Sequence, residues 1–183
     1  MRVKLLTKDK ERLTEIKFIW SYSFQKWNSK IAHKGKGHKE RLTEVTFIWF
    51  YSFQKWKMEF ENDIAHKVLN ICFDIHKQYG PGLFESVYEN ILCYELKKHN
   101  LEFASQFPIE VIHEGVNMDL GFRADVIVEE VVLLELKSVS KLEDVHFKQV
   151  ITYLKLTNLK LGLLINFNEP LLKNGIKRII NGY

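Results

Sequence analysis

Hydrophobic residues recur at helical spacing over two neighbouring segments in the middle of the chain. In residues 61–79 the apolar stripe consists of Ile64, Val68, Ile71, Ile75 and Tyr79. This period predicts an amphipathic helix, which the turn residues Gly80-Pro-Gly82 end. A second helix is expected from about Phe84 to His99, and its predicted inward stripe consists of Val87, Ile91 and Tyr94, widened on one side by Leu92 and Leu96.

The period changes after residue 100, where runs rich in β-branched residues alternate with polar, turn-like stretches. These runs predict strands over 107–113, 120–128, 131–137, 160–167 and 176–180, the last of them at a sheet edge. Helical spacing returns only in residues 143–156. The order α-α-β-β-β-α-β-β predicts an α/β domain in which helices flank a mixed β-sheet.

An internal repeat precedes this domain. Residues 10–27 recur as residues 39–56, with 15 of 18 positions identical. We interpret residues 1–57 as a duplicated, basic and aromatic-rich extension upstream of a domain that begins at Met58. The alternative is a functional arm whose aromatic stripe lies on a membrane surface, binds a partner or stacks on nucleobases. The stripe fits a helix and a strand almost equally well.

Composition and charge narrow the class of protein. Of 183 residues 46% are hydrophobic and 27% charged, which excludes wholesale disorder. No apolar run approaches the ~20 residues that span a membrane, and the first residues lack the apolar block of a secretion signal. Cys72 and Cys93 are too few for a disulfide framework, so we expect buried thiols and a cytoplasmic location. The net charge of +4 divides into +9 for residues 1–57 and −5 for residues 58–183.

Charged side chains interrupt two of the apolar strands. Side chains alternate along a strand, so Glu135 and Lys137 share one face of strand 131–137. A hairpin through Glu129-Glu130 would bring Asp125 of strand 120–128 close to Glu135. Two adjacent carboxylates repel each other, and a hard cation such as Mg²⁺ or Mn²⁺ resolves the conflict. The pattern therefore predicts a metal site, with Lys137 orienting or deprotonating a water; the alternative is a structural Glu–Lys pair with Asp125 capping a turn.

Further polar residues come from the predicted helices. His146, Gln149 and Tyr153 lie on one face of helix 143–156. Gln149 and Tyr153 are candidates to hold a phosphate or the attacking water, whereas an ordinary polar helix face is the better interpretation of His146. Glu85, just after Gly82, would reach the same site as a further acid or serve as a first-turn carboxylate.

These segments together resemble a known family. Gly82-Leu-Phe-Glu85-Ser-Val-Tyr88 matches the Gly-x-x-Glu-x-x-Tyr signature of the GxxExxY protein family, a branch of the PD-(D/E)XK nuclease superfamily. The resemblance covers essentially all of residues 58–183 and includes Gly80–Leu83, Arg123–Asp125, Glu135–Lys137, Gln149 and Tyr153, Leu163–Phe167 and Ile176–Arg178. It implies a restriction-endonuclease-like core with Asp125 and Glu135 as metal ligands, Lys137 as the catalytic lysine and Glu85 as an auxiliary acid and metal ligand. Gln149 and Tyr153 would be the helix motif of the RecB-like members, and the duplicated segment is not part of the family pattern.

The expected function is that of a nuclease hydrolysing phosphodiester bonds of DNA or RNA with a Mg²⁺- or Mn²⁺-activated water. Two alternatives stand beside it: a catalytically silent module that binds nucleic acid or protein while keeping the nuclease fold, and a membrane or partner anchor centred on the aromatic repeat. The balance of −5 in residues 58–183 counts against a DNA-binding role of this part, because DNA-binding domains usually carry a basic face. A homodimer, the strandedness of the substrate and its sequence preference stay open.

Overall fold

The computed structural model describes residues 36–118 and 121–182, with side chains from residue 50 onward. By its contacts the chain divides into two units, Met1–Lys57 and Met58–Tyr183. The first copy of the repeat, residues 10–27, lies outside the described residues. The stripe that fits a helix or a strand belongs to this first copy, so neither interpretation is tested. The second copy, residues 39–56, is helical. The predicted role of residues 1–57 and the predicted start at Met58 stay predictions.

Four helices are described: α2 (Lys36–Tyr79), α3 (Glu85–Lys98), α4 (Asp144–Thr157) and the single turn α5 (Leu172–Gly175). The sequence predicts α3 and α4 to within a residue or two. The predicted start of the first helix at residue 61 is wrong, because α2 already begins at Lys36. Residues 38–60 contain neither Pro nor Gly, so nothing in the backbone interrupts the helix there. No helix in the described part of the chain is long and apolar enough to cross a membrane.

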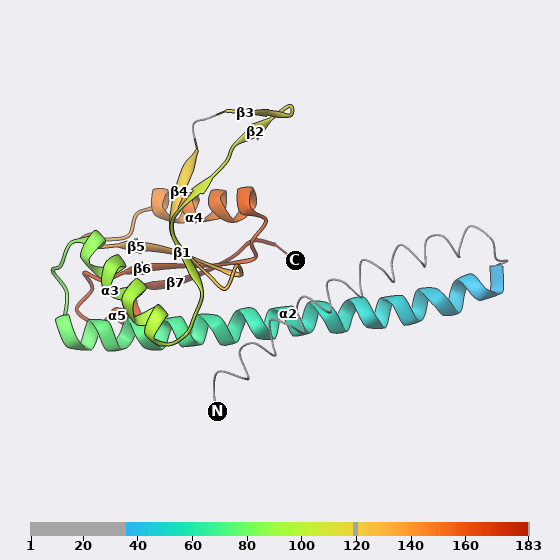
Figure 1. Ribbon diagram of the computed structural model, residues 1–183, viewed down its shortest axis with the longest axis horizontal. Coiled ribbons are helices and arrows are strands. Elements are labelled where there is room, and N and C mark those ends of the chain that lie inside the picture. Colours follow the sequence, from blue (N-terminus) through green and yellow to red (C-terminus); the bar gives the residue numbers. More distant parts are fainter. Residues whose placement is uncertain (1–35, 119–120, 183) are drawn as a thin grey trace. The chain divides into compact units, whose positions relative to one another are not determined.

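A five-stranded sheet in the order β1-β4-β5-β6-β7 forms the centre of the unit Met58–Tyr183 (Figure 1). Its strands are β1 (Phe103–Ile109), β4 (Phe122–Val128), β5 (Val132–Lys137), β6 (Leu161–Asn166) and β7 (Ile176–Ile180). Only β5 and β6 pair in parallel, and α4 lies between them in the chain as the crossover that parallel strands need. The mixed sheet and the edge position of β7 confirm the sequence prediction.

The strand predicted over 107–113 is divided in the structure. Its first part belongs to β1, which begins earlier, at Phe103, because Phe103–Ser105 already pair with β4. Its second part is β2 (Ile112–His113), which forms a small hairpin with β3 (Val116–Asn117). This hairpin projects from the sheet beyond β1 and β4 (Figure 1). The sequence did not predict it.

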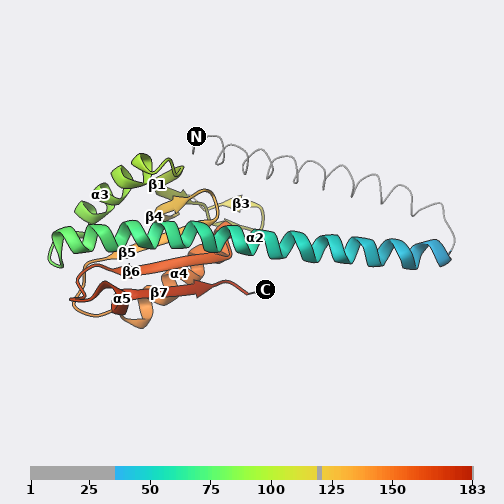
Figure 2. The ribbon, with the colours of Figure 1, turned by 90° about the horizontal axis from the view of Figure 1, so that it is seen from below.

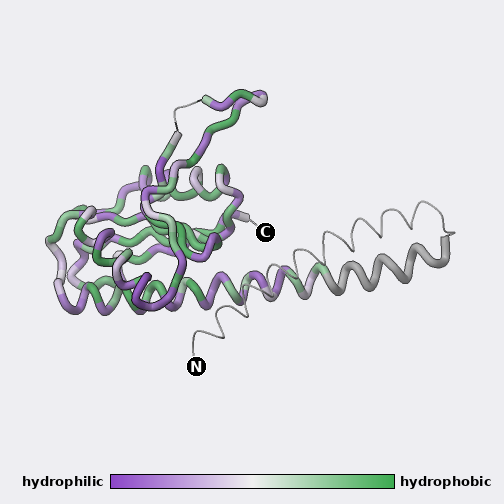
Figure 3. The backbone as a smooth tube through the Cα atoms, viewed as in Figure 1, coloured by the Kyte–Doolittle hydropathy of each residue, from purple (hydrophilic) through white to green (hydrophobic). Residues whose placement is uncertain are grey.

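Helices cover both faces of the sheet (Figure 2). The larger hydrophobic cluster joins α2 and α3 to one face, and the smaller cluster joins α4 to the other. In Figure 3 the middle of the sheet is coloured hydrophobic, whereas α3 and the coloured part of α2 alternate between hydrophobic and hydrophilic residues. The architecture is therefore the α/β arrangement that the sequence predicts, with helices on both faces of a mixed sheet.

The inward face predicted for the second helix is wrong in part. The buried residues of α3 are Tyr88, Leu92 and Leu96. Val87 and Tyr94, which were expected to point inward, are 38% and 67% exposed. Both sets have helical spacing, and the structure buries the set that contains the aromatic Tyr88, which stacks on Phe167 at 4.3 Å. The buried face of α3 is thus rotated from the predicted one.

The two cysteines lie in helices, as expected, and neither forms a disulfide. Cys72 is fully buried in α2, and burial raises the pKa of its thiol to about 12. Cys93 in α3 is only half-buried, and burial raises its thiol pKa to about 11.

Candidate active site

The candidate site lies where strands β4 and β5 separate. Their antiparallel pairing begins at the turn Glu129-Glu130 and ends at the pair Val126–Leu134. Both turn residues have positive φ, 50° and 57°, and the Val131 amide donates a hydrogen bond of 3.0 Å to the Val128 carbonyl, which closes the turn. Asp125 and Glu135 follow directly beyond the last pair, one on each strand. The predicted hairpin therefore brings the two acids to the same point of the sheet.

Asp125 bridges the opening between the two strands. Its Oδ2 accepts a hydrogen bond of 2.7 Å from the backbone amide of Leu136 on β5. On the other side of β4, Gln106 of β1 has a φ of +49°. The regular alternation of side chains along β4 is interrupted here. Ala124 belongs to the cluster under α4, whereas Val126, two residues further, belongs to the cluster under α2 and α3. The distortion gives the Asp125 carboxylate its position beside the end of β5.

Glu135 is the most buried acid of the site, with 1% of its surface exposed. Its neighbours Leu134 and Leu136 face α2 and α3, so by strand alternation Glu135 faces α4. Its Oε1 accepts hydrogen bonds from the ammonium of Lys137 and from Nε2 of Gln149, the latter at 2.7 Å. Its Oε2 is buried and has no hydrogen-bond partner within the described residues.

Helix α4 supplies the polar wall of the site. Gln149 Nε2 lies 2.9 Å from the Tyr153 hydroxyl as well as close to Glu135. The Tyr153 ring is 5% exposed and packs against Phe122 of β4, with ring centroids 5.4 Å apart. The spacing of four residues places Gln149 and Tyr153 on one face, as the sequence predicts. Tyr153 contacts Gln149 and Phe122 but makes no hydrogen bond to the acids.

His146, the third polar residue of that predicted face, has a different task. Its Nδ1 accepts a hydrogen bond of 3.0 Å from the backbone amide of Glu143, and the two side chains form a capping box at the start of α4. This supports the structural interpretation of His146.

Glu85 approaches the site from the start of α3. Its Oε1 lies 3.9 Å from the Lys137 ammonium. The turn before it is fixed by Tyr88, whose hydroxyl donates to the Gly80 carbonyl at 2.5 Å and accepts from the Leu83 amide at 3.3 Å. Gly82 in this turn has a φ of +110°, which side chains rarely tolerate. All six predicted site residues, Glu85, Asp125, Glu135, Lys137, Gln149 and Tyr153, are thus linked in one region.

Two residues to which the sequence prediction assigned no role hold this region together. Asn166 of β6 is fully buried, and its side-chain amide accepts from the Val139 amide at 3.0 Å and donates to the Val139 carbonyl at 2.8 Å. Ser138 Oγ donates to the Leu83 carbonyl at 2.6 Å. Together they tie the turn after Lys137 to β6 and to the turn before Glu85. The one sequence signal for Asn166 was an amide inside an otherwise apolar strand, whereas Ser138 gave none.

Burial raises the pKa of all three acids of the site. The pKa of the Glu135 carboxyl lies at about 7, raised chiefly by burial and then by the charge of Asp125, although the hydrogen bond from Lys137 lowers it. Burial also raises the pKa of Asp125 and of Glu85 above their ordinary values, against the lowering effect of Lys137. Burial lowers the pKa of Lys137, but its bond to Glu135 and the surrounding carboxylates raise that pKa by more.

The donor set fits a hard divalent cation. The carboxylates are buried, the pKa of Glu135 is raised, and one oxygen of Glu135 has no partner. Lys137 alone therefore does not balance their negative charge, and a further cation would. In residues 36–118 and 121–182 no three His, Cys, Asp or Glu side chains form a cluster that holds a metal by itself. Mg²⁺ does not require one, because it usually binds one or two carboxylates and completes its shell with water and substrate phosphate.

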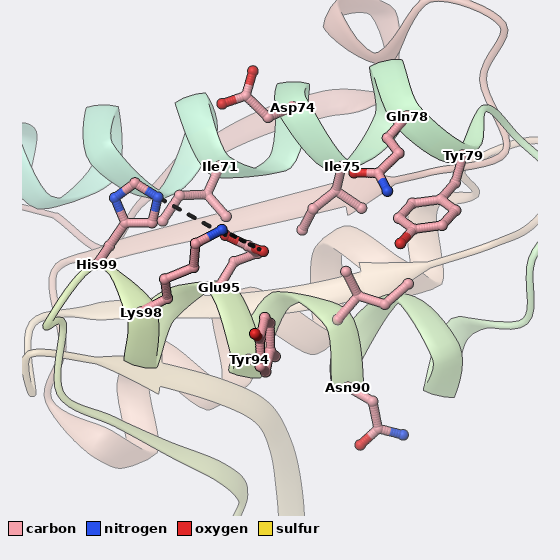
Figure 4. Close-up of a pocket in the computed structure, with 11 residues that line it drawn as sticks. Ile71, Asp74, Ile75, Gln78, Tyr79, Asn90, Tyr94, Glu95, Lys98 and His99 are labelled. Atoms are coloured by element: carbon pink, nitrogen blue, oxygen red, sulfur yellow. Dashed lines mark hydrogen bonds and ion pairs between the residues drawn. The ribbon is translucent and has the colours of Figure 1, made fainter.

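A separate groove of about 510 Å³ lies between α2 and α3 (Figure 4). Ile71 and Ile75 line it from α2, while Tyr94 and the ion-paired Glu95 and Lys98 line it from α3. It contains none of the six predicted site residues. The candidate active site therefore lies where β4 and β5 separate and not in this groove.

Comparison with known proteins matches the chain to one family. The model of the PD-(D/E)XK nuclease superfamily matches residues 62–179, a range that includes all six predicted site residues. No curated protein and no solved structure matches the chain.

Proposed function

This chain belongs to the PD-(D/E)XK nuclease superfamily, and we propose that it is a divalent-metal-dependent nuclease that hydrolyses phosphodiester bonds of DNA or RNA. The observation that carries the proposal is the environment of Glu135. A fully buried carboxylate with one oxygen unpartnered, beside a second acid and a lysine, is costly for stability. Such groups cluster at functional sites.

Asp125 and Glu135 would hold the metal, with Glu85 as a third acid. The bound cation would polarise the phosphoryl oxygen and lower the pKa of its water. The carboxylates contribute charge and position: Asp125 is fixed by the Leu136 amide, and Glu135 by Lys137 and Gln149. This leaves the unpartnered Oε2 of Glu135 available for the cation.

Lys137 acts as a charged donor in this proposal. Its raised pKa keeps the ammonium protonated at neutral pH, so it cannot serve as a general base in the metal-free protein. An ammonium beside the reacting phosphate stabilises the negative charge that develops on the phosphoryl oxygens. Gln149 donates through Nε2, and the Tyr153 hydroxyl beside that nitrogen helps to hold its orientation.

Within the superfamily, we assign the chain to the GxxExxY branch. Each named residue of the motif has a distinct structural task. Gly82 adopts the positive φ of the turn, Tyr88 closes the turn with its hydroxyl, and Glu85 starts α3 near Lys137. The motif thus brings an acid to the site from α3, an element separate from the two strands that would bind the metal.

The test is a titration of the full chain with Mn²⁺, read by thermal unfolding, on the wild type and on Glu135→Gln and Asp125→Asn. Saturating metal, at ~100 times its dissociation constant, should stabilise the wild type by about 2.7 kcal/mol. Both variants should lose this stabilisation, and cleavage of nucleic acid in Mn²⁺ should fall by at least about 100-fold.

Glu130→Gln serves as the matched control, because Glu130 is an exposed acid in the β4–β5 turn. Its metal response and cleavage should equal those of the wild type. A wild type without any response to millimolar metal would contradict the proposal and favour a catalytically silent binding module. Stabilisation that survives in Glu135→Gln would place the metal elsewhere.

A further inference from the structure

Two exposed phenylalanines flank the candidate site. Phe84, immediately before Glu85, is 82% exposed, and Phe122, three residues before Asp125, is 46% exposed. Phe84 belongs to the α3 side of the sheet and Phe122 contacts Tyr153 on the α4 side. The two residues therefore come from opposite sides of the sheet, and neither belongs to either hydrophobic cluster.

The backbone of Phe84 and the ring of Phe122 are each held by contacts. The Phe84 carbonyl accepts hydrogen bonds from the amides of Val87 at 2.9 Å and Tyr88 at 3.2 Å, which anchors the residue at the start of α3. The Phe122 ring packs on Tyr153, which in turn contacts Gln149 at the site. The backbone of Phe84 and the ring of Phe122 therefore lose little conformational freedom when a flat ligand binds against them.

The charge of the unit limits how it can bind nucleic acid. Residues 58–183 carry 13 Lys and Arg against 18 Asp and Glu, a balance of −5. Binding through many phosphate contacts requires a basic surface. Aromatic stacking on bases supplies affinity without such a surface. In a duplex, however, the base faces are already stacked on their neighbours, so only unpaired nucleotides offer them.

We propose that Phe84 and Phe122 are stacking platforms for unpaired bases on either side of the scissile phosphate, so that the substrate of this site is a single strand. The proposal rests on the proposed nuclease function for its position beside the scissile bond. The binding that it predicts does not depend on turnover. Phe84 and Phe122 would thus determine whether the substrate is single- or double-stranded, and the metal ligands are those proposed above.

The test measures binding of the full chain to a labelled oligothymidylate, an oligouridylate and a DNA duplex by fluorescence anisotropy, with EDTA present so that nothing is cleaved. The variants are Phe84→Ala, Phe122→Ala and the rescue variants Phe84→Trp and Phe122→Trp. Phe73→Ala is the matched control, because Phe73 of α2 is 41% exposed and lies outside the site. Residues 1–57 are present in every protein, so their contribution cancels when each variant is compared with the wild type on the same oligonucleotide.

The wild type should bind single strands more tightly than the duplex. Each alanine substitution should weaken single-strand binding roughly 5- to 150-fold, the worth of one stacked base, whereas tryptophan should restore it. This loss should be the same at about 50 mM and about 200 mM salt, because stacking releases no counterions. The two single-strand arms show whether the chain distinguishes DNA from RNA. Circular dichroism verifies that Phe122→Ala, which loses a packed ring, remains folded.

Tighter binding of the duplex, no binding of any oligonucleotide, or equal affinities of Phe84→Ala, Phe122→Ala and Phe73→Ala would overturn the proposal. The same proteins are then assayed for cleavage in Mn²⁺. Ring-dependent binding of single strands without cleavage would retain the platforms and reject the nuclease function. Cleavage that is equally fast in the wild type and both alanine variants would retain the nuclease function and reject the platforms.

Discussion

Glu135 contributes to the pH dependence of stability in the metal-free protein. Its carboxyl has a pKa of about 7 in the fold against 4.5 ordinarily. Between these values the unfolded chain releases the proton and the folded chain keeps it. Stability therefore falls as pH rises from about 4.5 to about 7, by an amount on the order of 3 kcal/mol, and does not recover above that range.

We predict that Glu135→Gln removes this fall, since glutamine has no proton to release. Urea unfolding of the metal-free wild type and variant at pH 5 and pH 8 measures it. The variant should gain stability relative to the wild type at the higher pH, less the cost of leaving Lys137 without its carboxylate partner. Mn²⁺ should recover the lost stability only in the wild type. An unchanged difference between the two proteins across this pH range would contradict the raised pKa.

Lys137 offers a way to separate metal binding from chemistry. Its ammonium bonds Oε1 of Glu135, the carboxylate whose other oxygen, Oε2, would bind the proposed cation. We predict that Lys137→Met binds Mn²⁺ at least as tightly as the wild type, because a competing positive charge is gone. Cleavage should nevertheless fall by about 100-fold or more.

Isothermal titration and a cleavage assay measure the two effects. Lys141→Met, at an exposed lysine in the loop that follows β5, is the control and should change neither. A loss of metal affinity in step with cleavage would mean that Lys137 supports the acids rather than the reaction.

At the scale of elements, the turn after β5 connects three parts of the site. Asn166 holds Val139, and Ser138 holds Leu83. We predict that Ser138→Ala reduces cleavage about fivefold to tenfold, because the loss of one hydrogen bond of about 1 kcal/mol loosens the turn before Glu85. Ser140→Ala, two residues further and exposed, should have no effect.

A double-mutant cycle with Glu85→Gln distinguishes positioning from general destabilisation. If Ser138 acts through Glu85, its substitution should have little further effect in the Glu85→Gln background. Fully additive losses would assign Ser138 a role in stability alone.

Helix α4 approaches the sheet closely at Gly162 of β6. A Cβ at this position would lie 2.6 Å from Cγ1 of Val150 and 3.2 Å from Cδ1 of Leu154. We predict that Gly162→Ala costs about 1–3 kcal/mol of unfolding free energy, because α4 must shift outward. The shift would also move Gln149, which neighbours Val150, and so reduce cleavage.

Denaturant unfolding of Gly162→Ala, Val150→Ala and the double variant tests this contact. Space made at Val150 should accommodate the added methyl group, so the double variant should be more stable than the sum of the single effects implies. Strict additivity would contradict a steric conflict between these two positions.

The accuracy of the sequence predictions followed the range of the interactions involved. Asp125, Glu135 and Lys137 were identified because a charge inside an apolar strand is visible in the sequence itself. The clamp of Asn166 on Val139 was not, because it depends on the parallel pairing of β5 with β6, which are separated by α4. The inward face of α3 was predicted wrongly in part for a related reason, since only the sheet selects Tyr88 over Val87 and Tyr94.

At the scale of the molecule, both hydrophobic clusters lie within the unit Met58–Tyr183. We predict that residues 58–183 alone unfold in one cooperative transition and keep the Mn²⁺ response of the full chain. Differential scanning calorimetry with and without metal measures both. A truncated chain without a cooperative transition would mean that residues 1–57 contribute to the fold.

The hairpin β2–β3 has a consequence for how this protein can change in length. Within the described residues, it contributes no side chain to either cluster. Insertions and deletions there should leave the fold intact, which makes the tip at Glu114-Gly115 a suitable place for an affinity tag or a fluorescent reporter. The turn Glu129-Glu130 is the opposite case, because one added residue would shift the register of β4 against β5 and carry Asp125 away from Glu135. Among related sequences, the β2–β3 hairpin should therefore vary in length, whereas the turn between β4 and β5 should keep its length.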